Sequence, residues 1–237
     1  MRNRINEAHE AEEEISSEPS KRKLVIPGEV IVTGEDFLPG EGAKRDGEDV
    51  ISLRFGLAEE IGKVVKVIPI FGAFIPRRNN VVIGRVSDIT YSGWLVDIDC
   101  AGSAFLPIEE FPRYVNKSEM AQHLAIGDVV AAKIWSVSGK SIDLAMKGRG
   151  LGPLQGGFIF HVTPARVPRV IGREGSMITL IKEKTGCDIT VGQNGWIWVK
   201  GADTDSEIRA RKAIEFVTDK AYIEGLTDKM EDWFKKN

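Results

Sequence analysis

The chain has 237 residues, 42% hydrophobic and 28% charged, which is enough for two or three small soluble domains. No stretch approaches 18 apolar residues and no apolar segment follows the charged start, so we expect neither a transmembrane helix nor a secretory signal. Cys100 and Cys187 lie far apart and form no C-x-x-C pair, which argues against a zinc ribbon and a disulfide framework. We therefore expect a cytoplasmic protein with no membrane contact.

The net charge of −3 argues at first sight against a nucleic-acid partner, but the charge is unevenly distributed. Residues 1–20 carry two basic and six acidic side chains, whereas residues 153–200 carry six basic and three acidic ones. Because local basic clusters determine affinity for phosphate, the positive block at 153–200 leaves RNA binding open.

The first 76 residues fall into two parts. Residues 1–20 are acidic and nearly free of large apolar side chains, which predicts a disordered tail, with a solvated helix as the alternative. Residues 21–76 predict a small N-terminal β domain, because Pro-Gly and Asp-Gly turn signals separate β-rich runs. The runs are Leu24–Ile26, Val30–Val32, Val50–Phe55 and Ile61–Ile68.

Residues 77–150 predict a five-stranded barrel. A short helix near Ser118–Leu124 is expected between the third and fourth strands, which is the element order of an OB fold. The expected strands are Val81–Ile89, Gly93–Ile98, Gly102–Leu106, Val129–Trp135 and Ser141–Leu144. Closely spaced glycines at 148–156 predict a linker or a tight junction after the barrel.

Residues 151–237 predict an α/β domain with the order β-α-α-β-β-α, followed by an amphipathic piece at Lys229–Lys235. Asn194-Gly195 is a hairpin signal between its last two strands, and Thr204 is expected to cap the last helix through a capping box. The other expected elements are a strand at Gly157–Val162, helices at Pro164–Ile171 and Ser176–Lys184, and strands at Asp188–Val191 and Trp196–Val199.

The loop Gly172-Arg173-Glu174-Gly175 carries a nucleic-acid signal. Two glycines between helices let the backbone approach a phosphodiester where a Cβ would clash, and N–H groups at the start of the next helix favour anions. In this order of elements the loop resembles that of a type I KH domain. Gly172, Arg173 and Gly175 are therefore RNA-binding candidates, with a structural bend as the alternative, and Glu174 would repel a phosphate.

The barrel resembles an S1 domain through Gly84–Val86, Tyr91–Val96 and Ala104–Pro107. Aromatic residues on the second strand of S1 domains stack bases, so Tyr91 and Trp94 are RNA-binding candidates, with the barrel core as the alternative for each.

Three cations of the barrel are further RNA-binding candidates. Arg113 and Lys117 lie in the long connection between the third and fourth strands, and Lys140 lies in the loop between the last two. The alternative for each is a solvated charge. We interpret Trp135 as a packing residue, together with Trp196, Trp198 and Trp233.

Taken together, the chain resembles the archaeal exosome RNA-binding cap subunits of the ribosomal-RNA-processing protein 4 family, over roughly residues 21–225. Lys23–Glu29 and Gly148–Gly152 carry the resemblance as well. It implies a fold that is multi-domain, β-rich plus α/β: an N-terminal β domain at 21–76, an S1-type OB barrel at 77–150 and a type I KH domain at 151–237.

The resemblance also implies a function and partners. Three copies would form a trimeric cap on a ring of RNase PH-like subunits and direct RNA 3′ ends into its pore for 3′-to-5′ degradation. The implied partners are single-stranded RNA, the ring subunits, and other copies of the chain or the zinc-ribbon cap subunit. The N-terminal β domain is the expected docking surface for the ring, because it has β edges and few nucleic-acid features.

No catalytic constellation is visible in the sequence. There is no P-loop, no G-x-S-x-G and no Cys–His arrangement, and the three histidines have no metal-ligand partners at useful spacing. We therefore expect no enzymatic activity, no metal and no cofactor. The alternative functions are a ribosome- or translation-associated S1/KH RNA-binding protein, or an enzyme that itself cuts RNA.

Overall fold

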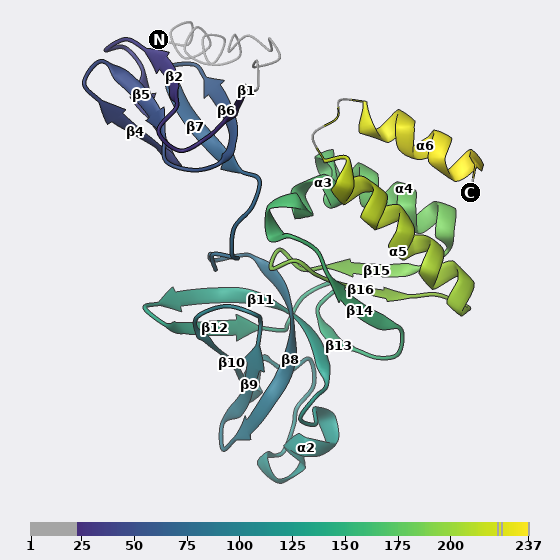
Figure 1. Ribbon diagram of the computed structural model, residues 1–237. Helices are drawn as coiled ribbons and strands as arrows, with labels where there is room; N and C mark the ends of the chain where they lie inside the picture. Colours follow the sequence, from purple (N-terminus) through teal and green to yellow (C-terminus); the bar gives the residue numbers. More distant parts are fainter. Residues whose placement is uncertain (1–22, 222, 224, 237) are drawn as a thin grey trace, which may run out of the picture. The chain divides into compact units, whose positions relative to one another are not determined.

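The computed structural model describes residues 23–221, 223 and 225–236 (Figure 1). The predicted tail, residues 1–20, lies outside the described residues. The chain divides into two compact units between Phe71 and Gly72, and the barrel and the C-terminal domain belong to the same unit.

The N-terminal unit contains two small sheets, with strand orders β1-β6-β7-β3 and β2-β5-β4. Its strands are β1 (Lys23–Val25), β2 (Val30–Thr33), β3 (Leu38–Pro39), β4 (Ala43–Asp46), β5 (Asp49–Ser52), β6 (Gly56–Ile61) and β7 (Val64–Pro69). Val25, Ala58 and Val67 form the buried core of this unit. The single strand predicted at Ile61–Ile68 is wrong, because Gly62 has a φ of 60° and turns the chain between β6 and β7.

The barrel has the predicted OB order. Its strands are β8 (Val81–Thr90), β9 (Gly93–Asp97), β10 (Ser103–Pro107), β11 (Val129–Ser138) and β12 (Ser141–Ala145). Neighbours pair antiparallel except β10 and β12, which run parallel, and the β11–β12 and β11–β8 pairings close the barrel. A 3-10 turn at Lys117–Glu119 and α2 (Met120–His123) form the predicted helical insert.

The glycine-rich stretch after the barrel is more ordered than a linker. β13 (Gly152–Leu154) pairs antiparallel with Val129–Ala131 of β11 and so extends the barrel sheet. The segment that follows the barrel therefore forms an additional strand of the barrel sheet.

The C-terminal domain has the predicted β-α-α-β-β-α order, with helices on one face of a sheet of order β14-β16-β15 (Figure 1). Its elements are β14 (Phe158–His161), α3 (Val167–Ile171), α4 (Ser176–Thr185), β15 (Asp188–Val191), β16 (Trp196–Lys200), α5 (Thr204–Asp219) and α6 (Leu226–Lys236). Ile181, Ile197 and Ile214 are fully buried between helices and sheet, and α6 adds Met230 and Phe234 to the same core.

The hairpin turn between β15 and β16 docks against β8 of the barrel. The Gln193 N–H donates to the Val81 carbonyl at 2.8 Å, and the Val81 N–H donates to Gln193 Oε1 at 2.9 Å. A Cβ on Gly192 would lie 2.8 Å from the Ile83 nitrogen, so only glycine allows this approach. The turn therefore joins the barrel and the C-terminal domain.

Candidate nucleic-acid interface

The loop from Gly172 to Gly175 lies between α3 and α4, as predicted, and its two glycines serve different needs. Gly172 has a φ of 77°, and a Cβ there would lie 2.7 Å from the Met177 nitrogen, so this position has no space for a side chain. Gly175 has a φ of 81° and nothing within 4 Å of an added Cβ, so the surface above it is open. Of the two, only Gly175 offers room for a ligand backbone.

The charges of this loop are opposed. Arg173 and Glu174 are both exposed, and Glu174 takes a left-handed conformation with a φ of 52°. No side chain caps the start of α4, which leaves its first N–H groups for an anion. Glu174 lies two residues before the first residue of α4, so its negative charge disfavours a phosphate at this helix start.

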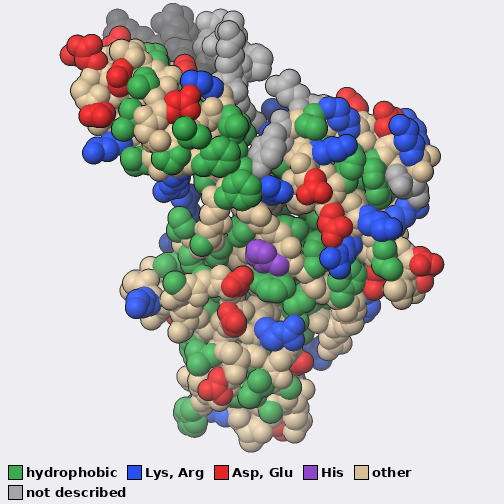
Figure 2. Space-filling model, in the orientation of Figure 1, with side chains coloured by type: hydrophobic (Ala, Val, Ile, Leu, Met, Phe, Trp, Pro, Cys, Tyr) green, Lys and Arg blue, Asp and Glu red, His purple; other side chains and the backbone are tan. Residues whose placement is uncertain are grey.

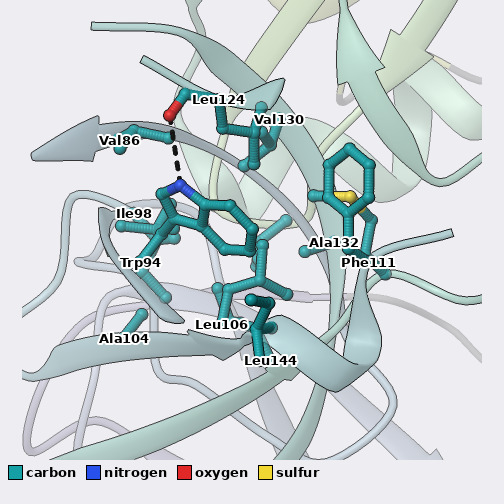
Figure 3. Close-up of a cluster of buried hydrophobic side chains, with 14 of the residues drawn as sticks. Val86, Trp94, Ile98, Ala104, Leu106, Phe111, Leu124, Val130, Ala132 and Leu144 are labelled. Atoms are coloured by element: carbon teal, nitrogen blue, oxygen red, sulfur yellow. Dashed lines mark hydrogen bonds between the residues drawn. The ribbon is translucent and has the colours of Figure 1, made fainter. Parts of the chain in front are cut away.

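Trp94 is wrongly predicted as a base-stacking residue. It is fully buried in the barrel core, and its Nε1 donates to the Leu124 carbonyl at 3.1 Å (Figure 3). Its ring packs against Phe111, with 5.7 Å between the ring centroids. A buried indole with a satisfied N–H cannot meet an RNA base, so Trp94 organises the barrel.

Tyr91, in contrast to Trp94, lies on the surface. It lies in the turn between β8 and β9, its side chain is 80% exposed, and Lys117 Nζ sits 3.9 Å from the centroid of its ring. Residues 26 positions apart in the sequence are thus brought into one cation–π pair. An exposed aromatic ring beside a lysine can stack a base and neutralise the adjacent phosphate.

The segment that leads into Lys117 lines an open pocket of about 670 Å³. Arg113, Lys117 and Lys147 contribute cations to this pocket, and Glu109 contributes one carboxylate. Tyr114, which sequence reasoning did not single out, also lines it and is 89% exposed. The available signal was its position directly after Arg113 and three residues before Lys117, a basic segment that includes an aromatic residue.

Lys140 lies apart from the Tyr91–Lys117 pair and does not line this pocket. It is exposed in the turn between β11 and β12, and its carbonyl accepts from the Ser103 N–H at the start of β10. The Tyr91 turn adjoins the other end of β10, where the Ile108 N–H donates to the Ser92 carbonyl. The structure therefore places Lys140 and Tyr91 at opposite ends of β10.

The described residues contain no group of three or more His, Cys, Asp or Glu side chains that could hold a metal ion. Within the same residues, no helix is long and apolar enough to cross a membrane.

Comparisons with known proteins agree with this geometry. The sequence model of the KH domain matches residues 157–205. Exosome complex component Rrp4 of Methanothermus fervidus is 39% identical over 214 residues, which are 90% of this chain and 95% of that protein. The Nitrosopumilus maritimus protein of the same name is 37% identical over 220 residues, 91% of this chain and 97% of that protein.

A third relative and a solved structure point the same way. Exosome complex component Rrp4 of Methanothermobacter thermautotrophicus is 39% identical over 90% of this chain and 68% of that protein. A crystal structure described as a candidate exosome complex RNA-binding protein is 34% identical, with a TM-score of 0.62 over 70% of this chain and 97% of that one. The chain therefore belongs to the family of exosome complex component Rrp4.

Proposed function

We propose that the chain is a non-catalytic RNA-binding subunit of the exosome, which forms a trimeric cap on a ring of RNase PH-like subunits and directs RNA 3′ ends into the pore. In this role it works in the cytoplasm. The observation that carries RNA binding is the exposed Tyr91–Lys117 pair. The pair lies on the surface, with 3.9 Å between Lys117 Nζ and the ring centroid, so packing in the barrel core does not explain it.

The RNA-binding role is assigned first to the barrel. Tyr91 offers a face for a base, and Arg113, Lys117 and Lys147 give the adjoining pocket an excess of positive charge over Glu109. Arg173 and Gly175 form a weaker second contact in the KH domain, because Glu174 opposes phosphate there. Lys140 contributes as an isolated cation of the barrel end.

Ring docking is assigned to the N-terminal unit, where apolar side chains lie on the surface (Figure 2). The register of β1, β6 and β7 aligns Leu24, Leu57 and Ile68 in one row across the sheet. Leu24 is 53% exposed and Ile68 is 36% exposed. Side chains at alternate positions, such as Val25 and Val67, are buried, so this sheet is apolar on both faces.

A second row of apolar side chains lies on the same face of the sheet and also favours ring docking. Ile61 pairs with Val64, and Val64 pairs with Leu38 of β3, and all three are exposed. The Glu59–Lys66 salt bridge, at 3.1 Å, lies between the two rows. An apolar face with one internal ion pair fits a stable protein partner, here the ring, better than it fits RNA.

The test is co-purification of the full chain with RNase PH-like ring subunits, read by native mass spectrometry, together with binding of single-stranded RNA. We expect three copies per ring and tighter RNA binding by the assembly through avidity. Leu24→Glu combined with Ile68→Glu should abolish ring binding, whereas Ile208→Glu, at an exposed apolar position of α5, should not. Co-purification with ribosomal subunits in place of the ring would overturn the proposal.

A further inference from the structure

Trp135 of the barrel is not a packing residue. Its side chain is 57% exposed, although tryptophan usually contributes a large buried area. The register of β11 against β12 skips it, because Ile134 pairs with Leu144 and Ser136 pairs with Asp143. Trp135 is thus the extra residue of a β-bulge, a feature that re-aims a side chain.

Arg78 lies over the exposed ring. Its guanidinium carbon is 4.8 Å from the centroid of the Trp135 ring. The turn that carries Arg78 is tied to the bulged strand by two backbone bonds of 2.8 Å, from the Asn79 N–H to the Ile134 carbonyl and from the Ile134 N–H to the Asn80 carbonyl. Both bonds involve Ile134, the residue before Trp135, so the backbone holds the turn of Arg78 next to the strand that carries the indole.

The surroundings of the pair favour an anionic aromatic ligand. Arg77 and Arg78 are both exposed, and Lys133 lies two positions before Trp135 on the outward side of the same strand. The nearby carboxylate of Asp143 already accepts from the Ser136 hydroxyl. Cations beside an exposed indole match single-stranded nucleic acid, whose bases stack and whose phosphates pair with arginine.

We propose that Trp135 and Arg78 form a second base-stacking site for single-stranded RNA on this barrel. The site is separate from the Tyr91–Lys117 pair. β8 begins at Val81, just after the Arg78 turn, and ends at Thr90, just before Tyr91. At about 3.3 Å per residue, the two sites lie at opposite ends of a strand roughly 30 Å long. This inference rests on the proposed RNA-binding function and adds a second point at which the barrel holds the strand.

The test compares RNA affinities of the full chain by fluorescence anisotropy with a labelled single-stranded oligonucleotide. Trp135→Leu, which keeps an apolar side chain but removes the stacking surface, should weaken binding about tenfold. Trp135→Phe should stay close to wild type, because an aromatic face remains. Arg78→Ala should weaken binding and Arg78→Lys should restore part of the loss. Ile208→Ala, on the exposed face of α5, is the matched control and should have no effect.

A second readout separates stacking from a structural effect. RNA should quench the tryptophan fluorescence of the wild type, and Trp135→Phe should lose most of that quenching while it still binds. Unchanged affinity in Trp135→Leu, with Tyr91→Ala still weakening RNA binding, would overturn the second site and leave the proposed function intact. If Trp135→Leu leaves the RNA affinity unchanged but abolishes co-purification with the ring, Trp135 makes a protein contact and the second RNA site is likewise overturned. If the wild type binds no RNA, the proposed function fails as well.

Discussion

The side-chain amide of Asn194 forms a two-bond ring with the backbone of Ile83, which joins the KH hairpin to the first strand of the barrel. Asn194 Nδ2 donates to the Ile83 carbonyl at 2.8 Å, and the Ile83 N–H donates to Asn194 Oδ1 at 3.2 Å. Nδ2 also donates to the Ile98 carbonyl at 2.9 Å. Asn194 is only 1% exposed, so its amide groups are paired without help from bulk solvent.

Asn194→Ala should therefore destabilise the unit formed by the barrel and the KH domain. It leaves buried backbone groups of Ile83 and Ile98 unpaired, and we expect the free energy of unfolding to fall by about 2–3 kcal/mol. Urea denaturation followed by circular dichroism measures the change. Gln193→Ala is the control, because it removes one side-chain bond at an exposed position and should cost less than about 1 kcal/mol. Equal losses in the two variants would contradict the role of Asn194.

The sequence predicts Asn194-Gly195 only as a hairpin turn, because local patterns report only on residues that are close in the sequence. Turn chemistry and strand periodicity depend on neighbours in the sequence, so the OB order and the β-α-α-β-β-α order were both predicted correctly. The contact of Asn194 with Ile83 joins residues 111 positions apart, and no local pattern encodes it.

The same limit explains the errors in the candidate site. Tyr91 and Trp94 belong to one short turn-and-strand segment, and strand pattern alone did not decide which of them faces the core. The sequence predicts Trp135 as a packing residue, which is wrong because a β-bulge changes the direction of this side chain and has no signal in the sequence. The cap of α5 is Asp203 instead of Thr204, a shift of one residue between two side chains that both cap helices well.

Tyr91 and Lys117 should contribute to RNA affinity in different ways. Tyr91→Ala should weaken binding of single-stranded RNA by about 1–3 kcal/mol, the range for loss of one stacked base, whereas Tyr91→Phe should retain most of the affinity. Lys117→Ala should weaken binding and reduce the slope of log affinity against log salt by about one, because one phosphate contact is lost. Affinities measured at several salt concentrations test both statements. A salt slope unchanged by Lys117→Ala would argue that this lysine only supports the Tyr91 ring.

Glu174→Gln should strengthen RNA binding. The substitution removes a negative charge beside Arg173 at the start of α4 and keeps the size of the side chain. Because the loop is exposed, the gain should be about 1.4- to fivefold, in line with roughly 0.2–1 kcal/mol for an exposed charge interaction. Glu183→Gln, near the other end of α4, makes the same change in net charge away from the loop. If both variants gain equally, the effect belongs to net charge and the KH loop makes no contact with RNA.

Asp203 should make the stability of α5 depend on pH in the acid range. The Ser206 N–H donates to Asp203 Oδ1 at 2.7 Å, and this bond holds the pKa of the Asp203 carboxyl below its usual value of 3.8. A lowered pKa in the folded state means that the cap stabilises the helix fully above the unfolded pKa and loses this effect as the pH falls through the folded pKa. Asp203→Ala should thus lower the urea midpoint at pH 6 and differ less from wild type at pH 3.

Two further variants separate the cap from the general charge of the helix start. Asp203→Asn keeps an oxygen that accepts from Ser206 and should retain most of the stability at pH 6, but without the titration. Asp205→Asn removes a carboxylate of the first turn that does not accept this bond, and it should leave the acid dependence of the urea midpoint in place. If Asp205→Asn removed that dependence as fully as Asp203→Asn, the negative charge near the helix N-terminus would be the cause, and the hydrogen bond from Ser206 would not.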